Sequence, residues 1–212
     1  SKVWRLLLAN PFRLLPVSFA AMISLGTLLL LLPQATSSGQ KTRFLDALFT
    51  ATSAVCVTGL SVVDTATHWS GFGQGIILLL IQVGGLGIVT VVSIGIVLFA
   101  DRIGLSHTRV LAADLRTDTY SNVPRLVRNI VLTTLAFEAL FAVVLAARFF
   151  FAHNYGFGTS VLHGIFHSIS AWNNAGFALY TDNFLGFAND WFFSIAVCLA
   201  VILGGIGFPV LR

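Results

Sequence analysis

A short pattern occurs twice in this chain, as Phe49-Thr-Ala-Thr-Ser-Ala-Val-Cys-Val-Thr-Gly59-Leu60 and as Phe166-His-Ser-Ile-Ser-Ala-Trp-Asn-Asn-Ala-Gly176-Phe177. Four residues fall in register between the copies: Phe49/Phe166, Ser53/Ser170, Ala54/Ala171 and Gly59/Gly176. Each copy is apolar but too short to cross a bilayer, and each ends at a glycine that begins an irregular stretch. Backbone that enters a membrane partway and returns is tolerated where it lines a pathway or coordinates ions. The pattern therefore predicts an ion pathway.

The composition favours an integral membrane protein. Hydrophobic residues make up 57% of the 212 residues and charged residues only 9%, whereas soluble domains carry about 25% charged residues. The two cysteines, Cys56 and Cys198, both lie in apolar segments, so no disulfide framework is expected. Nothing in the composition predicts an enzyme or a nucleic-acid partner.

Apolar runs divide the chain into two similar halves. A membrane-crossing helix needs about 20 apolar residues, and four runs qualify: about 14–32, 72–100, 129–152 and 191–211. The segments 44–60 and 160–177 lie between members of each pair and are shorter, while the return 57–69 is too polar to face lipid. We therefore expect an all-α integral membrane protein of two helix–pore-helix–helix repeats with re-entrant filter loops, as in potassium channels. The first repeat would occupy 1–118 and the second 119–212.

The distribution of positive charge predicts the orientation. With the N-terminus in the cytoplasm, three basic residues lie outside (Lys41, Arg43, Arg148) and the other nine inside (Lys2, Arg5, Arg13, Arg102, Arg109, Arg116, Arg125, Arg128, Arg212). Two spans per repeat give both repeats the same topology, so they are parallel repeats about an axis along the membrane normal. Both glycine segments then lie on the same side of one central pathway.

Backbone carbonyls can replace the hydration shell of a monovalent cation without a fixed charge. Glycine permits the backbone angles that such a lining requires. We expect ion binding at Val57, Thr58, Gly59, Asn174, Ala175 and Gly176, flanked by Cys56, Leu60, Asn173 and Phe177. The alternative is that Gly59 and Gly176 only cap helices.

Other residues leave alternatives open. Glu138 lies in the middle of the third span, where a carboxylate needs a partner or a water-filled cavity. The acids Asp46, Asp64, Asp182 and Asp190 either concentrate cations at an outer mouth or are solvated loop residues. The clusters Gly84–Gly87 and Gly204–Gly207 allow close helix packing or act as a hinge.

His163 and His167 have the i, i+4 spacing of a metal-binding pair. No further ligand accompanies them at helical spacing. Local hydrogen bonding at the end of the second short helix is the alternative.

The motifs at 55–60, 84–87 and 172–177 resemble the Trk/Ktr/HKT superfamily of potassium transporters, closest to the bacterial Ktr membrane subunit. The resemblance covers essentially the whole chain. It implies that Gly59 and Gly176 are the selectivity glycines and that potassium is the transported ion, with no covalently bound cofactor. It also implies a multi-pass protein of the bacterial inner membrane and a cytoplasmic ring of nucleotide-binding regulatory subunits, which the loop 101–128 would contact.

Members of that superfamily have four repeats around one pathway, and this chain supplies two. We therefore expect it to be the N-terminal half of a longer protein, or else to form a homodimer, and to contact membrane lipids. Two further hypotheses remain: a non-conducting structural or regulatory membrane subunit, and an intramembrane metalloprotein that uses His163 and His167.

Overall fold

The computed structural model describes residues 11–100 and 123–206, and within these ranges every named element is a helix. The elements are α2 (Pro11–Leu30), η1 (Pro33–Ala35), α3 (Phe44–Val55), α4 (Gly71–Ala100), α6 (Val123–Ala152), α7 (Phe157–Trp172), η2 (Leu185–Phe187) and α8 (Trp191–Ile206). The expected all-α class is confirmed for this part of the chain. The predicted boundary between 118 and 119 lies outside the described residues, as do 101–122 of the predicted cytoplasmic loop.

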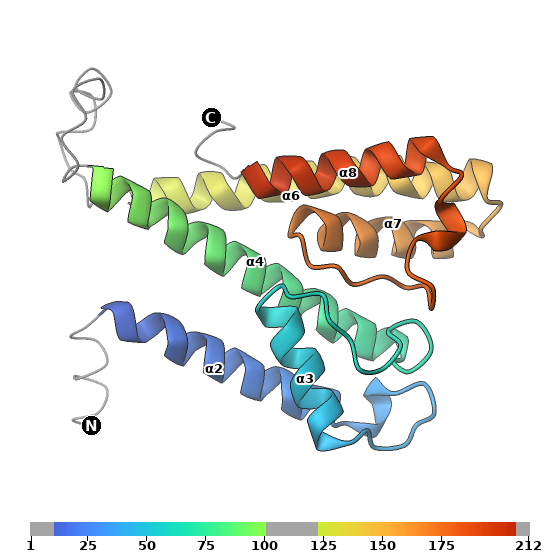
Figure 1. Cartoon of the computed structure of the whole chain (residues 1–212), viewed down its shortest axis with the longest axis horizontal. Helices are drawn as coiled ribbons and strands as arrows, with labels where there is room; N and C mark the ends of the chain where they lie inside the picture. Colours follow the sequence, from blue (N-terminus) through green and yellow to red (C-terminus); the bar gives the residue numbers. More distant parts are fainter. Residues whose placement is uncertain (1–10, 101–122, 207–212) are drawn as a thin grey trace.

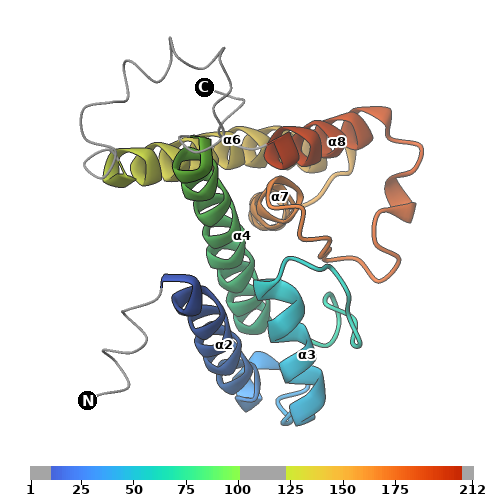
Figure 2. The same ribbon diagram turned by 60° about the vertical axis from the view of Figure 1, so that its left-hand side comes forward.

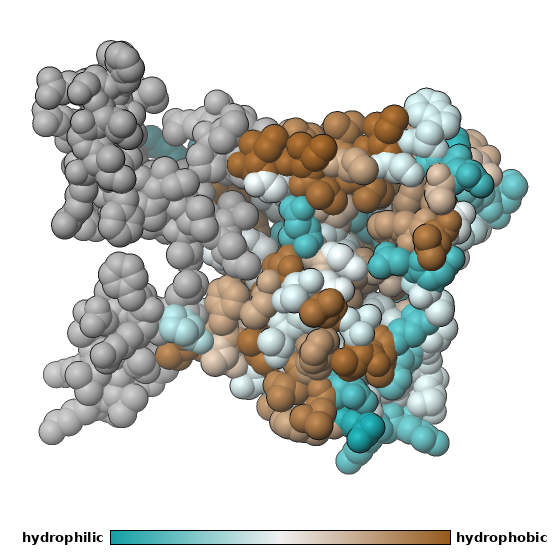
Figure 3. Space-filling model, viewed as in Figure 1, coloured by the Kyte–Doolittle hydropathy of each residue, from teal (hydrophilic) through white to brown (hydrophobic). Residues whose placement is uncertain are grey.

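The helices form two groups, α2–α4 and α6–α8, and in each group the short helix, α3 or α7, packs against both longer helices (Figures 1 and 2). The segments that follow α3 and α7 both run back towards the edge where the connecting loops gather. Hydrophilic residues collect at that edge in the space-filling view, whereas apolar residues cover much of the described helices (Figure 3).

One helix within the described ranges, Val127–Ala152, is long and apolar enough to cross a membrane. Three of the other apolar helical stretches, Pro16–Leu30, Gly71–Gly87 and Trp191–Ile206, are shorter. The described parts of the expected spans at 14–32, 72–100 and 191–211 lie mostly in helices α2, α4 and α8, but whether these cross a membrane stays a prediction.

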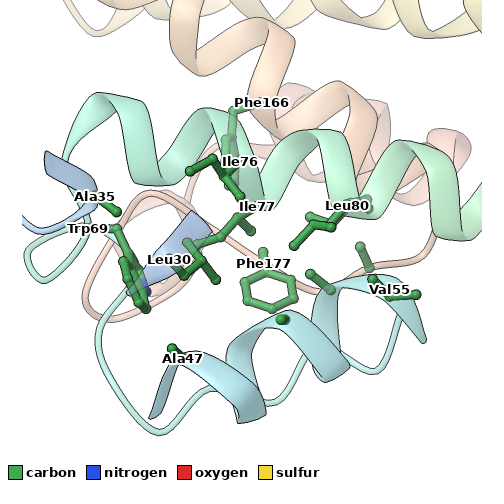
Figure 4. Close-up of a cluster of buried hydrophobic side chains, with 14 of the residues drawn as sticks. Leu30, Ala35, Ala47, Val55, Trp69, Ile76, Ile77, Leu80, Phe166 and Phe177 are labelled. Carbon is green, nitrogen blue, oxygen red and sulfur yellow. The ribbon is translucent and has the colours of Figure 1, made fainter. Parts of the chain in front are cut away.

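The largest core contains residues from both groups. Leu30, Val55, Trp69, Ile77 and Ile81 of the first group are fully buried or nearly so. Three residues of the segment that follows α7 join them: Ala175, Phe177 and Leu179. This return is therefore anchored in the other group, with Phe177 pointing into the cluster (Figure 4). The two copies of the pattern therefore share one core.

An ion pair joins the end of α6 to the start of α8. Arg148 donates from Nε to Asp190 Oδ2 at 2.9 Å and from Nη2 to Oδ1 at 3.0 Å, and His153 Nε2 lies 2.8 Å from Oδ2. Asp190 also accepts a hydrogen bond from the backbone N–H of Phe193 at 3.0 Å, so it is the N-cap of α8. The hydrogen bonds from Arg148 hold the pKa of Asp190 well below its usual value. Of the four predicted outer acids, this one has a structural role.

We expect Asp190→Asn to lower the midpoint of thermal unfolding in detergent by several degrees, since the loss of a charged cap and its ion pair costs roughly 1 kcal/mol or more. Because the folded pKa is depressed, the stabilisation is present above the ordinary aspartate range of about 4 and is lost as the pH falls below it. The difference between wild type and variant should therefore shrink in acid. Asp182→Asn, which alters an exposed carboxylate, is the control, and an equal effect of both variants would contradict the assignment.

Candidate functional site

The predicted ion-binding residues lie in two segments with matching backbone, which we name the first Gly segment (56–60) and the second Gly segment (173–177). Cys56 and Asn173, the C-caps of α3 and α7, have φ/ψ of −84°/2° and −80°/0°. The next residues, Val57 and Asn174, have φ of 54° and 57°. Positive φ is strained for a β-branched residue such as Val57 and marks a position that its surroundings over-determine.

The glycines continue the match. Gly59 and Gly176 have φ of 76° and 73°, whereas Thr58 and Ala175 between the positive-φ residues are not in that region. Left-handed and ordinary backbone therefore alternate in both segments. The repeat seen in the sequence is a repeat of conformation as well.

The first backbone N–H groups of each segment are directed back at the preceding helix. Thr58 N–H donates to Ser53 at 2.9 Å and Val57 N–H to Ala54 at 3.3 Å. In the second segment, Ala175 N–H donates to Ser170 at 2.7 Å and Asn174 N–H to Ala171 at 3.0 Å. Both segments thus satisfy carbonyls at the C-terminal end of their own short helix.

The two segments approach each other at their glycines. A Cβ on Gly59 would lie 2.7 Å from the Ala175 carbonyl oxygen and 3.0 Å from Gly176 Cα. A Cβ on Gly176 would lie 3.0 Å from Gly59 Cα. Glycine is therefore required here for its conformation and for close backbone approach, which goes beyond a helix-capping role.

A cavity lies at each end of the Gly segments. One, of about 300 Å³, is lined by residues before the glycines, including Val57 and Asn174, together with Thr134. The other, also about 300 Å³, is lined by Gly59, Gly176 and the residues that follow them. The segments therefore separate two cavities.

Asp64 and Asp182 line the second of these cavities. A side-chain hydrogen bond with Thr181 holds the pKa of Asp64 below its usual value, so this carboxylate is negative at neutral pH. Asp64 follows the first Gly segment and Thr181 the second, so the contact links the two returns. Asp46 lies apart from this cavity, in the first turn of α3.

The side chains of the two segments are placed differently. Thr58 is exposed and Leu60 is 60% exposed, whereas Ala175 is fully buried and Phe177 is 3% exposed. The anchoring of Ala175 and Phe177 in the shared core was not anticipated from the sequence. The apolar residues at 175 and 177–179 were the available signal.

Glycines of α4 and α8 pack against the ends of the short helices. A Cβ on Gly84 would overlap the carbonyl oxygen of Val55, and a Cβ on Gly204 would overlap that of Trp172. Val55 and Trp172 are the last residues of α3 and α7. Of the two roles predicted for these glycine clusters, the structure shows close helix packing at Gly84 and Gly204.

His163 and His167 form local hydrogen bonds. His167 is fully buried; its Nδ1 lies 2.8 Å from the His163 carbonyl and its Nε2 accepts from Leu179 N–H at 3.1 Å. His163 Nδ1 lies 2.8 Å from the Tyr180 hydroxyl. Both ring nitrogens of His167 are thus occupied, and the part of the chain that the structure describes holds no cluster of three potential metal ligands.

The chain was compared with known proteins. The family model TrkH, described as "Cation transport protein", matches residues 4–212. The Ktr system potassium uptake protein B of Bacillus subtilis (strain 168) is 38% identical over 202 residues, covering 95% of this chain and 44% of that protein. The protein of the same name from Vibrio alginolyticus is 39% identical over 199 residues, covering 94% of this chain and 43% of that protein.

A third relative, the potassium/sodium uptake protein NtpJ of Enterococcus hirae, is 36% identical over 203 residues, covering 96% of this chain and 45% of that protein. The chain therefore spans less than half the length of these relatives.

We expect Gly84→Ala and Gly204→Ala to destabilise the fold by about 1–3 kcal/mol, the usual cost of overpacking. The added methyl group meets backbone that cannot rotate away. The readouts are the yield of monodisperse protein and its thermal midpoint in detergent. Gly75→Ala is the matched control, because it lies in the same α4 and its Cβ would meet nothing within 4 Å. Wild-type stability of both test variants would refute the packing role.

Proposed function

The chain belongs to the TrkH family of cation transport proteins, and we propose that it forms part of a potassium-selective pathway through a cell membrane. In this proposal backbone carbonyls of Val57, Thr58, Gly59, Asn174, Ala175 and Gly176 coordinate dehydrated K⁺. The two parallel repeats, 1–118 and 119–212, each contribute one Gly segment to the selectivity filter. The names of the relatives, which are potassium uptake proteins, support potassium as the ion.

The observation that carries the proposal is the matched backbone of the two Gly segments. In a trans peptide group the N–H and the C=O point in opposite directions. Because the N–H groups of Val57 and Thr58 point back at α3, the carbonyls of Cys56 and Val57 point away from it. The same holds for Asn173 and Asn174 relative to α7. Of the six proposed ligands, the carbonyl oxygens of Val57 and Asn174 are thereby left free for an ion.

The electrostatics suit a monovalent cation. The C-terminal ends of α3 and α7 carry partial negative charge, and they adjoin the Gly segments. Carbonyl oxygens coordinate without a fixed charge, so the ion can leave again. The acids Asp64 and Asp182 at the second cavity raise the local cation concentration. A membrane potential drives such flux at about 2.3 kcal/mol per charge per 100 mV.

The two Gly segments of this chain could surround an ion only in part. We propose that two more such segments complete the pathway, supplied either by the rest of a longer polypeptide or by a second copy of this chain. The coverage of 43–45% of the relatives' length favours the longer polypeptide. We also propose a cytoplasmic nucleotide-binding regulatory subunit at the loop 101–128. The relative's name, "Ktr system" potassium uptake protein B, supports an assembly of several components.

A non-conducting structural or regulatory subunit would have the same fold. Potassium uptake by vesicles that contain the full-length protein separates this alternative from transport. No observation in the described residues favours the metalloprotein hypothesis.

We expect Gly59→Ser to lower the preference for K⁺ over Na⁺ by roughly tenfold. A left-handed conformation costs a non-glycine residue about 1–3 kcal/mol, which is enough for such a change. The new Cβ would also crowd Ala175 O at 2.7 Å. Gly176→Ser should act in the same direction but less, because its Cβ would be 3.8 Å from the nearest carbonyl oxygen, that of Gly59.

The measurement is competitive uptake of K⁺ and Na⁺ into vesicles by the full-length protein. Gly75→Ala should leave the ratio of the two rates unchanged. An unchanged ratio in both serine variants would refute the filter assignment, and absence of K⁺ uptake by the wild type would refute transport itself.

A further inference from the structure

Glu138 is a buried carboxylate in the middle of α6 whose hydrogen-bond partner is an amide. Its side chain is 4% exposed, and the salt bridges among the described residues do not include it. Asn173 Nδ2 donates to Glu138 Oε1 at 2.9 Å. Gln82 of α4 also approaches this carboxylate, but its amide makes no hydrogen bond of good geometry. A buried carboxylate is costly to retain without hydrogen bonds.

Asn173 is the residue at which α7 ends and the second Gly segment begins. Its Nδ2 donates both to Glu138 and to the Ile169 carbonyl, the latter at 2.9 Å. Its Oδ1 occupies the space that a Cβ on Gly85 of α4 would need. The side chain of Asn173 is thus held between α6, α7 and α4, one residue before Asn174 with its positive φ.

A second hydrogen bond from α7 reaches Glu138. Ser168 Oγ donates to the Glu138 backbone carbonyl at 2.6 Å. Side chain and backbone of one α6 residue therefore both hold the last turns of α7. This fixes the rotation of α7 about its axis and the direction in which the chain leaves it.

Among the described residues, the first copy has no such brace. Cys56 occupies the position of Asn173 and is exposed, and α2 contains no acidic residue. Within the described residues the brace is therefore a feature of the second copy alone, and the residues shared by the two copies do not account for it.

We propose that Glu138 is a positioning residue for the second Gly segment, acting through Asn173 to orient the carbonyls of 174–176. This inference rests on the proposed function. It assigns the carboxylate a hydrogen-bonding role that a neutral acceptor of the same shape can fill, and it excludes a role as a charge that attracts the ion.

The test uses the full-length protein in vesicles and measures the ratio of K⁺ to Na⁺ uptake. We expect Glu138→Ala and Asn173→Ala each to lower this ratio by about fivefold, the factor that corresponds to the loss of one hydrogen bond. Glu138→Gln is the matched control: its amide oxygen can still accept from Asn173, so the ratio should stay within roughly twofold of wild type. The double alanine variant should be no worse than the more affected single variant, because both remove the same interaction.

Should Glu138→Ala not accumulate in the membrane, Asn173→Ala is measured in the Glu138→Gln background, where no buried carboxylate is left unpaired. The ratio of K⁺ to Na⁺ uptake is then expected to fall by the same factor of about five. A Glu138→Gln variant as impaired as Glu138→Ala would assign the role to the charge and overturn the proposal. Alanine variants with reduced total uptake but an unchanged ratio would overturn it as well. A wild type that takes up no K⁺ contradicts the proposed function instead, so the two failures are distinguishable.

Discussion

The backbone contact between Gly59 and Gly176 is the constraint on which the rest of the structure depends. Two left-handed residues meet with Cα atoms so close that a Cβ on either would lie within 3.0 Å of the other. To bring them together, α3 and α7 must end at the same level and aim their C-termini at the same region. The glycines Gly84 and Gly204 allow this, because they let α4 and α8 lie directly against the last residues of the short helices.

The two copies reach the same backbone conformation by different means. In the second copy Ser170 Oγ donates to the Phe177 carbonyl at 2.6 Å, and His167 accepts from Leu179 N–H. The equivalent positions of the first copy are Ser53 and Thr50, which are buried and whose hydroxyls have no hydrogen-bond partner among the described residues. The second return is also anchored by Phe177 in the core of the other group (Figure 4). The second copy is therefore the more heavily braced, and the Glu138–Asn173 bond adds to this bracing.

Such bracing has a physical purpose in a site made of backbone. Backbone carbonyl oxygens select an ion through how many of them contact it and where they lie. Unlike side-chain ligands, they cannot adjust by changing rotamer. Whatever fixes the peptide planes therefore fixes the coordination geometry. The acids are separate from the proposed carbonyl lining: Asp190 is paired with Arg148, and Asp64 and Asp182 line the cavity on the far side of the glycines.

The sequence by itself determined the helical class, the bounds of α3 to within a residue or two, and the equivalence of Gly59 and Gly176. These are local properties, because each depends on residues close together in the sequence: the length of an apolar run, the polarity of the return, or the position of a glycine in a repeated pattern. The start of α7 was expected at 160 and lies at 157, because helix ends depend on capping as well as on apolar periodicity. Only the tertiary structure decided that the two glycines touch, that Phe177 belongs to the core of the other group, and that Asn173 is the partner of Glu138. Those contacts join residues far apart in the chain, and their geometry depends on how the helices pack, which no local pattern specifies.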